Sequence, residues 1–178
     1  MDLDWCKDPL HRRLVVLSHG LEGDSRRPYV AGAARYFFDR GWDALAWMCR
    51  SCSGSMNLTP RLYSHGQSED LATVVEHAVA TGRYHQIVLI GYSMGGNLTL
   101  KYLGQTGAKV PAEVSHGIAF SAPAYLQPAV AALERPSNRL YKQKFFRALS
   151  AKIRAKAEQF PGLLEVSWLA QVKAWEDF

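Results

Sequence analysis

Short apolar runs alternate with stretches of helical periodicity up to residue 121 of the chain. Strand-like runs lie at 14–17, 43–50, 86–90 and 117–121. The run at 14–17 has the apolar character of a buried parallel strand. Helical stretches separate the four runs, as expected when parallel strands are joined by crossover connections. The alternation predicts an α/β fold with a mostly parallel sheet flanked by helices.

Three helices are predicted between these strands. Pro28 opens a stretch that runs to residue 39, and Gly41 closes it, as is typical of helix ends. The second helix follows a long loop at 51–67 and carries one apolar stripe, made of Leu71, Val74, Val75, Ala78 and Val79. We expect the Ser68 hydroxyl to cap its first turn. The third helix spans 96–106.

The chain changes character after Pro123. Residues 129–133, 140–157 and 163–178 have helical patterns, and no further strand-like run follows them. We therefore expect two parts: the N-terminal part of an α/β core at 1–123, and a helical lid segment at 124–178.

Composition narrows the class of protein. The 178 residues are 48% hydrophobic and 21% charged, which is typical of a globular domain, and no apolar run approaches the roughly 18 residues of a transmembrane helix. The N-terminus lacks the basic and apolar regions of a signal peptide.

The chain has three cysteines, Cys6, Cys49 and Cys52, which is an odd number, and no second CxxC completes a zinc site. These features predict a cytoplasmic protein with reduced thiols.

The net charge of +5 comes from one segment. Residues 135–156 hold eight basic residues and no acidic residue, so the rest of the chain carries a net charge of −3. This distribution does not indicate a nucleic-acid-binding body. The segment is either a solvated face of a lid helix or a surface attracted to anionic lipid headgroups. Its apolar face would consist of Leu140, Tyr141, Phe145, Phe146, Leu149 and Ile153.

The strongest chemical signal is Gly91-Tyr92-Ser93-Met94-Gly95, a GxSxG motif directly between a predicted strand and a predicted helix. A serine at such a turn is exposed at the carboxyl end of the sheet, and the flanking glycines relieve crowding of the backbone. The helix N-terminus offers free amides to a developing oxyanion. This context predicts a nucleophile elbow at Ser93, with a simple tight turn as the alternative.

A second glycine loop, His19-Gly20-Leu21, follows the strand at 14–17. In sheets of this kind this loop supplies the other oxyanion amide, so we expect the backbone N–H groups of Leu21 and Met94 to form the oxyanion hole. His19 lies on the wrong strand for a general base. We expect it to hold the loop by hydrogen bonds instead.

These motifs resemble the α/β-hydrolase superfamily and, within it, the YheT-like (AB-hydrolase-4) family. The similar stretches are Leu3-Asp4-Trp5, 19–23 with Tyr29, Arg40-Gly41-Trp42, 50–54 with Asn57, Arg61-Leu62-Tyr63, 91–97, Ser121-Ala122-Pro123 and Phe160-Pro161-Gly162. Two positions depart from the family, which usually has glycine where Ser51 stands and Tyr-His-Ser-Gly where this chain has Tyr63-Ser64-His65-Gly66.

The resemblance implies the α/β-hydrolase fold and a serine hydrolase of carboxylic esters, with short-acyl or lipid-like esters as substrates. In the implied mechanism Ser93 attacks the ester carbonyl, the Leu21 and Met94 amides hold the oxyanion, and a histidine aligned by an acid transfers the proton. An acyltransferase and an inactive hydrolase-like remnant are the alternatives. No metal or nucleotide cofactor is indicated, because His11, His77 and His85 are scattered and no phosphate-binding loop is present.

The acid and the histidine of the triad are not evident in these 178 residues. In this fold both follow the serine, yet His116 is the only histidine after Ser93, and Glu113 is the only acid between them. His116 precedes the last predicted strand, at the amino end of the sheet. Glu176 and Asp177 follow no strand. We therefore expect an incomplete chain, either an internal piece or a truncated gene product of a longer hydrolase, with little or no activity alone.

Overall fold

A five-stranded sheet forms the centre of the computed structural model, which describes residues 1–177, except for the side chain of Glu176. The strands are β1 (Asp2–Cys6), β2 (Arg13–Ser18), β3 (Asp43–Met48), β4 (Gln86–Tyr92) and β5 (Val114–Phe120), in the order β1-β3-β2-β4-β5. Strands β2 to β5 are parallel, and β1 runs antiparallel to β3. The predicted mostly parallel sheet is therefore confirmed.

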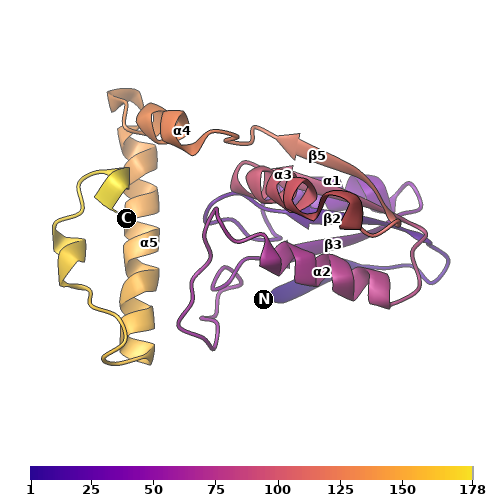
Figure 1. Ribbon diagram of the computed structural model, residues 1–178, viewed down its shortest axis with the longest axis horizontal. Helices are drawn as coiled ribbons and strands as arrows, with labels where there is room; N and C mark the ends of the chain where they lie inside the picture. Colours follow the sequence, from indigo (N-terminus) through magenta and orange to yellow (C-terminus); the bar gives the residue numbers. More distant parts are fainter. Residues whose placement is uncertain (178) are drawn as a thin grey trace.

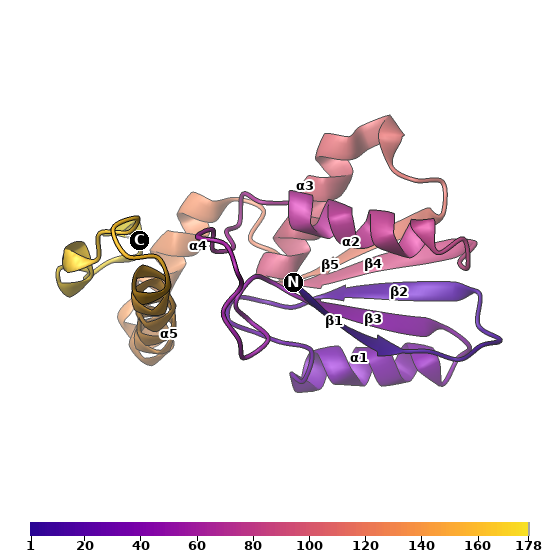
Figure 2. The same ribbon diagram turned by 90° about the horizontal axis from the view of Figure 1, so that it is seen from below.

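Helices cover both faces of this sheet (Figures 1 and 2). Helix α1 (Pro28–Phe38) lies on one face, and α2 (Glu69–Ala80) and α3 (Met94–Thr106) lie on the other. The side chains of β2 alternate between two apolar layers: Leu14 and Val16 pack on the α2–α3 side, whereas Val15 and Leu17 pack on the α1 side. This two-sided burial explains why the central strands are continuous apolar runs in the sequence.

The first strand, β1, was not among the strands predicted from the apolar pattern. It is an edge strand of five residues in which every second residue is exposed. Leu3 and Trp5 pack against the core, whereas Asp2 and Asp4 alternate with them. An alternating strand with two carboxylates has no apolar run to signal it, so only its pairing with β3 defines it.

The remaining elements are η1 (Gly107–Lys109), α4 (Leu126–Leu133), η2 (Pro136–Asn138), α5 (Arg139–Gln159), η3 (Ser167–Ala170) and η4 (Trp175–Asp177). Helices α4 and α5 stand beyond the end of the sheet to which the parallel strands point (Figure 1). No helix of the described residues has both the length and the apolar character to cross a membrane.

Two predictions of local structure are wrong. The segment 163–178 is not one helix, because its described part contains only the short 3₁₀ helices η3 and η4, and Phe178 lies outside the described residues. There the Asp177 carboxylate accepts the N–H groups of Lys173 and Ala174, which closes a turn. The Ser68 hydroxyl does not cap α2, because it donates to Gln105 Oε1 at 2.7 Å instead.

Candidate functional site

Ser93 occupies a sharp turn between β4 and α3. It has φ +53° and ψ −117°, a left-handed conformation that costs energy for a residue with a Cβ atom. The turn brings the backbones of neighbouring elements together: a Cβ atom on Gly91 would lie 2.2 Å from the Gly95 carbonyl oxygen, and one on Gly95 would lie 2.3 Å from the Ser18 carbonyl oxygen. Both flanking glycines are therefore required, and the predicted strand–turn–helix is present.

The glycine loop His19-Gly20-Leu21 lies directly beside the serine. A Cβ atom on Gly20 would be 3.3 Å from Ser93 Cβ. The Gly20 N–H donates to the Tyr29 hydroxyl at 3.1 Å, and the Tyr29 ring contacts the Tyr92 ring with centroids 4.8 Å apart. The loop is thus held next to the nucleophile by a side chain from α1, which the sequence pattern did not identify as part of the site.

His19 holds this glycine loop by hydrogen bonds, as predicted. It is 1% exposed, its Nδ1 lies 2.7 Å from the Gly20 carbonyl oxygen, and its Nε2 accepts the Cys49 N–H at 3.0 Å. Since Nε2 accepts a hydrogen bond, the ring is neutral with its proton on Nδ1. Burial lowers the pKa of His19 and keeps the ring in this form.

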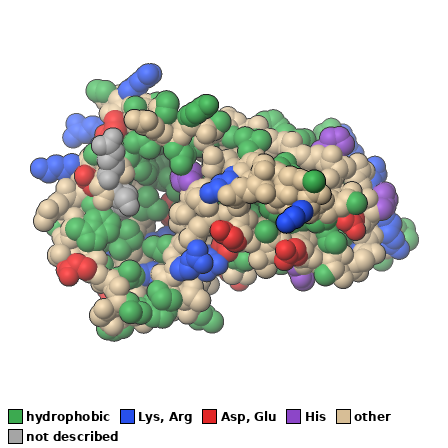
Figure 3. Space-filling model, in the orientation of Figure 1, with side chains coloured by type: hydrophobic (Ala, Val, Ile, Leu, Met, Phe, Trp, Pro, Cys, Tyr) green, Lys and Arg blue, Asp and Glu red, His purple; other side chains and the backbone are tan. Residues whose placement is uncertain are grey.

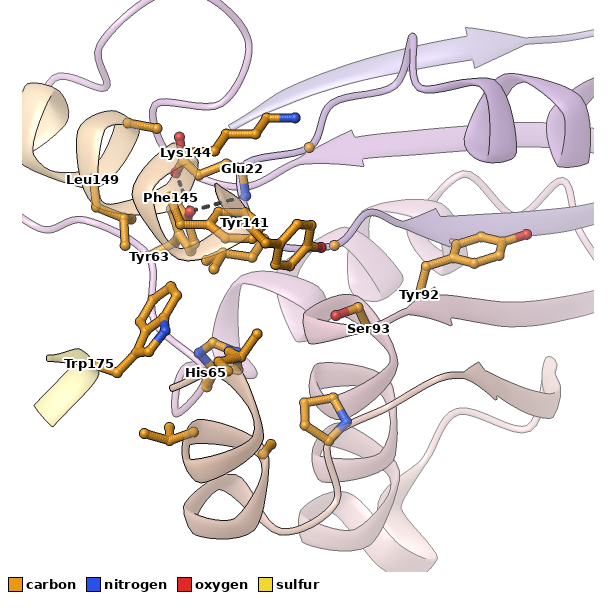
Figure 4. A pocket seen from close by; sticks show the side chains of 18 of the residues that line it. Glu22, Tyr63, His65, Tyr92, Ser93, Tyr141, Lys144, Phe145, Leu149 and Trp175 are labelled. Carbon is orange, nitrogen blue, oxygen red and sulfur yellow. Dashed lines mark hydrogen bonds between the residues drawn. The ribbon is translucent and has the colours of Figure 1, made fainter. Parts of the chain in front are cut away.

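Ser93 is exposed to a cavity of about 1190 Å³ that lies between the sheet and helices α4 and α5 (Figure 4). Figure 4 shows the Ser93 hydroxyl at the start of α3, directed into this cavity, with Tyr141, Phe145 and Leu149 of α5 facing it from the opposite wall. Leu21, Tyr63 and His65 also line it. Most of the apolar face predicted for segment 135–156 therefore faces the cavity.

A polar cluster ties α5 to the loop after Leu21. Lys152 Nζ lies 2.8 Å from Glu22 Oε1 and 3.1 Å from Cys52 Sγ, and the Tyr63 hydroxyl donates to the same Glu22 oxygen. Burial lowers the pKa of Lys152, but Cys52 and Glu22 outweigh it and raise this pKa above its usual value. The Lys152 ammonium therefore stays charged and holds Glu22, which itself has a left-handed φ of +55°.

Lys156 forms a second tie, one helical turn further along α5. It is fully buried, and its ammonium donates to the carbonyl oxygens of Asn57 and Thr59 and to Gln159 Oε1. Burial lowers the pKa of Lys156. The interpretation of all eight basic residues as one solvated face is therefore wrong for Lys152 and Lys156. They point inward because Glu22 and the loop at 51–67 offer them acceptors.

The candidate triad partners are not beside Ser93. His116 lies within β5, not ahead of it as expected, and pairs in register with Val88. It is four residues before Phe120, roughly 13 Å along the strand from the edge where Ser93 emerges. The Glu113 carbonyl oxygen accepts the Ile87 N–H at 2.7 Å, at the amino end of the sheet. Asp177 is used in a local turn, and the Glu176 side chain is outside the described residues.

His65 is a histidine in the cavity that sequence reasoning did not connect to the site. It lies in the long loop and lines the same cavity as Ser93 (Figure 4). Burial lowers the pKa of His65, which favours a neutral imidazole. Among the described residues, no histidine makes a hydrogen bond to the Ser93 hydroxyl. The loop fold, not a motif, brings His65 to this wall.

Comparison with known proteins places the chain in a family. The family described as "Serine aminopeptidase, S33" matches residues 9–164. YheT of Escherichia coli (strain K12), named as an esterase, is 30% identical over 177 residues, which are 98% of this chain and 51% of that protein. Phospholipase ABHD3 of Bos taurus is 28% identical over 187 residues, covering 100% of this chain and 45% of the relative. The chain spans about half the length of these curated relatives.

Solved structures share the fold at low identity. Est1E of Butyrivibrio proteoclasticus, solved with ferulic acid bound, has a TM-score of 0.62 at 15% identity, over 74% of this chain and 52% of that chain. The Pyrococcus furiosus esterase Pf2001 has a TM-score of 0.59 at 22% identity, over 76% and 51%. Given the family match and the strand–turn–helix at Ser93, the chain belongs to the serine aminopeptidase S33 family of α/β-hydrolases, among its YheT-like members.

Proposed function

We propose that this chain is the nucleophile-bearing part of a serine hydrolase that cleaves carboxylic esters through an acyl-enzyme. The observation that carries the proposal is the exposed Ser93 on its strained turn, within a few ångströms of the Gly20 loop and facing a large apolar cavity. Esterase and phospholipase relatives support it.

In this mechanism Ser93 Oγ attacks the ester carbonyl carbon, and its proton passes to a histidine. The carbonyl oxygen becomes an oxyanion that accepts hydrogen bonds from the backbone N–H groups of Leu21 and Met94. Met94 is the first residue of α3, where backbone N–H groups have no partner within the helix and the dipole favours negative charge. The histidine then gives this proton to the leaving alcohol. Water, deprotonated by the same histidine, attacks the acyl group, and the proton returns to Ser93 Oγ as the carboxylic acid leaves.

The charges of the cavity favour an ester with an apolar acyl chain over a peptide with a free N-terminus. An aminopeptidase needs a carboxylate that is free to bind the substrate ammonium. Here the cavity carboxylate Glu22 is already paired with Lys152, and Lys144 adds a further cation to the lining. Arg27 also lines the cavity, at 3.9 Å from the Asp24 carboxylate. A substrate ammonium would therefore meet net positive charge, whereas a neutral or lipid-like ester would meet the aromatic and aliphatic walls.

We further propose that the acid and the histidine of the triad are supplied by sequence beyond these 178 residues, so that the chain alone is nearly inactive. An oxyanion hole without a general base retains only a small part of the rate enhancement. The loss of activity would be several orders of magnitude. The position of His116 far along β5 supports this proposal.

A fluorophosphonate probe tests both parts of the proposal. In the 178-residue chain we expect little labelling and no hydrolysis of p-nitrophenyl acetate above background. In a longer chain that also carries the acid and the histidine we expect rapid labelling of Ser93, found by mass spectrometry and lost in Ser93→Ala. Ser121→Ala is the matched control, because Ser121 lines the same cavity and also has a left-handed φ.

Two results would contradict the proposal. Labelling of the longer chain at a residue other than Ser93 would refute the nucleophile assignment. Rapid labelling of the 178-residue chain would show that a base is already present, and loss of that labelling in His65→Ala would identify His65 as that base.

A further inference from the structure

A second concave site lies on the side of α5 that faces away from the Ser93 cavity. This outer cleft has a volume of about 630 Å³. Its lining consists of Glu134, Arg135, Pro136, Arg139, Lys142, Gln143, Phe146, Arg147 and Lys173. Tyr141, Phe145 and Leu149 occupy the cavity face of α5, whereas Arg139, Gln143 and Phe146 occupy the cleft face. One helix therefore separates the two sites.

The outer cleft is strongly cationic. Five of its residues are basic and one is acidic. The acid, Glu134, is already satisfied, since it pairs with Lys142 and also accepts the Trp175 N–H at 2.8 Å. Within the described residues, no carboxylate lies at ion-pair distance from Arg135, Arg139, Arg147 or Lys173, and all four are exposed. Figure 3 shows Lys and Arg side chains gathered over the corner between α4 and α5.

An exposed apolar side chain follows one of the cations of the cleft along the chain. Leu140 comes directly after Arg139 in the first turn of α5 and is 82% exposed. An exposed leucine would not contribute to the binding of a small soluble anion. Basic residues together with an exposed leucine at the end of a helix are typical of surfaces that rest on the interface of a bilayer.

From these observations we propose that the outer cleft binds the phosphate-bearing headgroups of an anionic lipid bilayer, with Arg139, Arg147 and Lys173 as the principal cations and Leu140 in contact with the interface. Planar guanidinium groups bind phosphate oxygens in pairs. The inference does not depend on the chemistry of Ser93, because none of the residues assigned to the lipid site lines the Ser93 cavity.

Vesicle co-sedimentation of the 178-residue chain tests the inference. We expect sedimentation with vesicles of phosphatidylcholine and phosphatidylserine in equal amounts, none with phosphatidylcholine alone, and release by high salt. Each cation near an anionic surface contributes about fivefold in affinity. The double variant Arg139→Gln/Arg147→Gln should therefore bind about 25-fold more weakly. Arg139 and Arg147 are both exposed, so we expect the variant to fold normally, and an unchanged thermal melting curve would verify this.

The matched control is Arg26→Gln/Arg154→Gln, which removes the same charge from exposed positions outside the cleft. We expect this control to keep most of the affinity. An equal loss in both double variants would overturn the proposal in favour of diffuse attraction, as would sedimentation with neutral vesicles. Tight binding of glycerol phosphate or of RNA without vesicle binding would overturn it in favour of those ligands.

Discussion

Lys152 Nζ lies 2.8 Å from Glu22 Oε1, so an ion pair joins helix α5 to the loop that carries Leu21. The two side chains are 16% and 12% exposed, which shields the pair from much of the solvent that weakens surface ion pairs. The Tyr63 hydroxyl, whose pKa burial raises, donates to the same carboxylate. One contact thus couples the far wall of the cavity to the proposed oxyanion loop.

Replacing Lys152 should loosen α5 and destabilise the chain. In Lys152→Met the Glu22 carboxylate loses its charged partner while it remains largely buried, so we expect the free energy of unfolding to fall by about 2 kcal/mol. Hydrogen exchange of α5 amides should accelerate. Arg154→Met, on an exposed position of the same helix, should change stability by less than about 0.5 kcal/mol. Equal effects would show that the ion pair does not hold α5.

Two glycines of α3 should respond to alanine in opposite directions. Gly95→Ala would place a Cβ atom 2.3 Å from the Ser18 carbonyl oxygen and 2.5 Å from the His19 carbonyl oxygen. Neither backbone can move freely, so we expect a loss of about 3 kcal/mol or a failure to fold. Gly104→Ala meets nothing within 4 Å and should stabilise the helix by about 0.5–1 kcal/mol. Chemical denaturation of both variants measures the contrast.

Removal of His19 should cost far more than removal of His116. His19→Ala deletes two buried hydrogen bonds and leaves a cavity, for an expected loss of about 3 kcal/mol. His116 is exposed on β5, so His116→Ala should stay within about 0.5 kcal/mol of the parent chain. A large effect of His116→Ala would mean that β5 packs differently from this structure.

His19 should also make stability depend on pH. Burial lowers the pKa of His19 in the folded chain, whereas the unfolded value is about 6.5. As the pH falls through 6.5 the unfolded state binds the proton first, so the free energy of unfolding decreases, by up to about 1.4 kcal/mol per pH unit, until the folded value is reached. His19→Gln should reduce this slope. His65 contributes equally to both proteins, so the difference in slope isolates His19.

Ser51 tests the cost of a side chain in the left-handed region. Its φ is +61°, in the region that favours glycine, and its hydroxyl donates to Asn57 Oδ1 at 2.6 Å. Ser51→Gly and Ser51→Ala both lose this hydrogen bond, but only alanine keeps the strained Cβ atom. We expect Ser51→Ala to be less stable than Ser51→Gly by about 1 kcal/mol. Equal stabilities would show that the turn tolerates a Cβ atom without strain.

The nucleophile turn could be predicted because its determinants are contiguous. A buried strand, two glycines around Ser93 and a helical stretch follow one another within about 20 residues, and their geometry depends mainly on local backbone sterics. The role of His19 followed in the same way from its place at the end of β2. The edge strand β1 was missed because it has no apolar run. The segment after Gly162 was wrongly predicted as one helix, because its helical spacing does not reveal the local turns that interrupt it.

Other features of the site depend on contacts between residues that are far apart in the sequence. Lys152 meets Glu22 across 130 residues, and Lys156 meets Asn57 across 99. Along the chain these two lysines look the same as Arg147 and Arg154, since charge and helical spacing are all that a sequence displays. Which side chains turn inward is decided by the acceptors that the folded loops present, and a buried ammonium group is stable only where those acceptors are in place. The chemistry of Ser93 is thus encoded locally, whereas the walls of its cavity arise only when α5 packs against the loops.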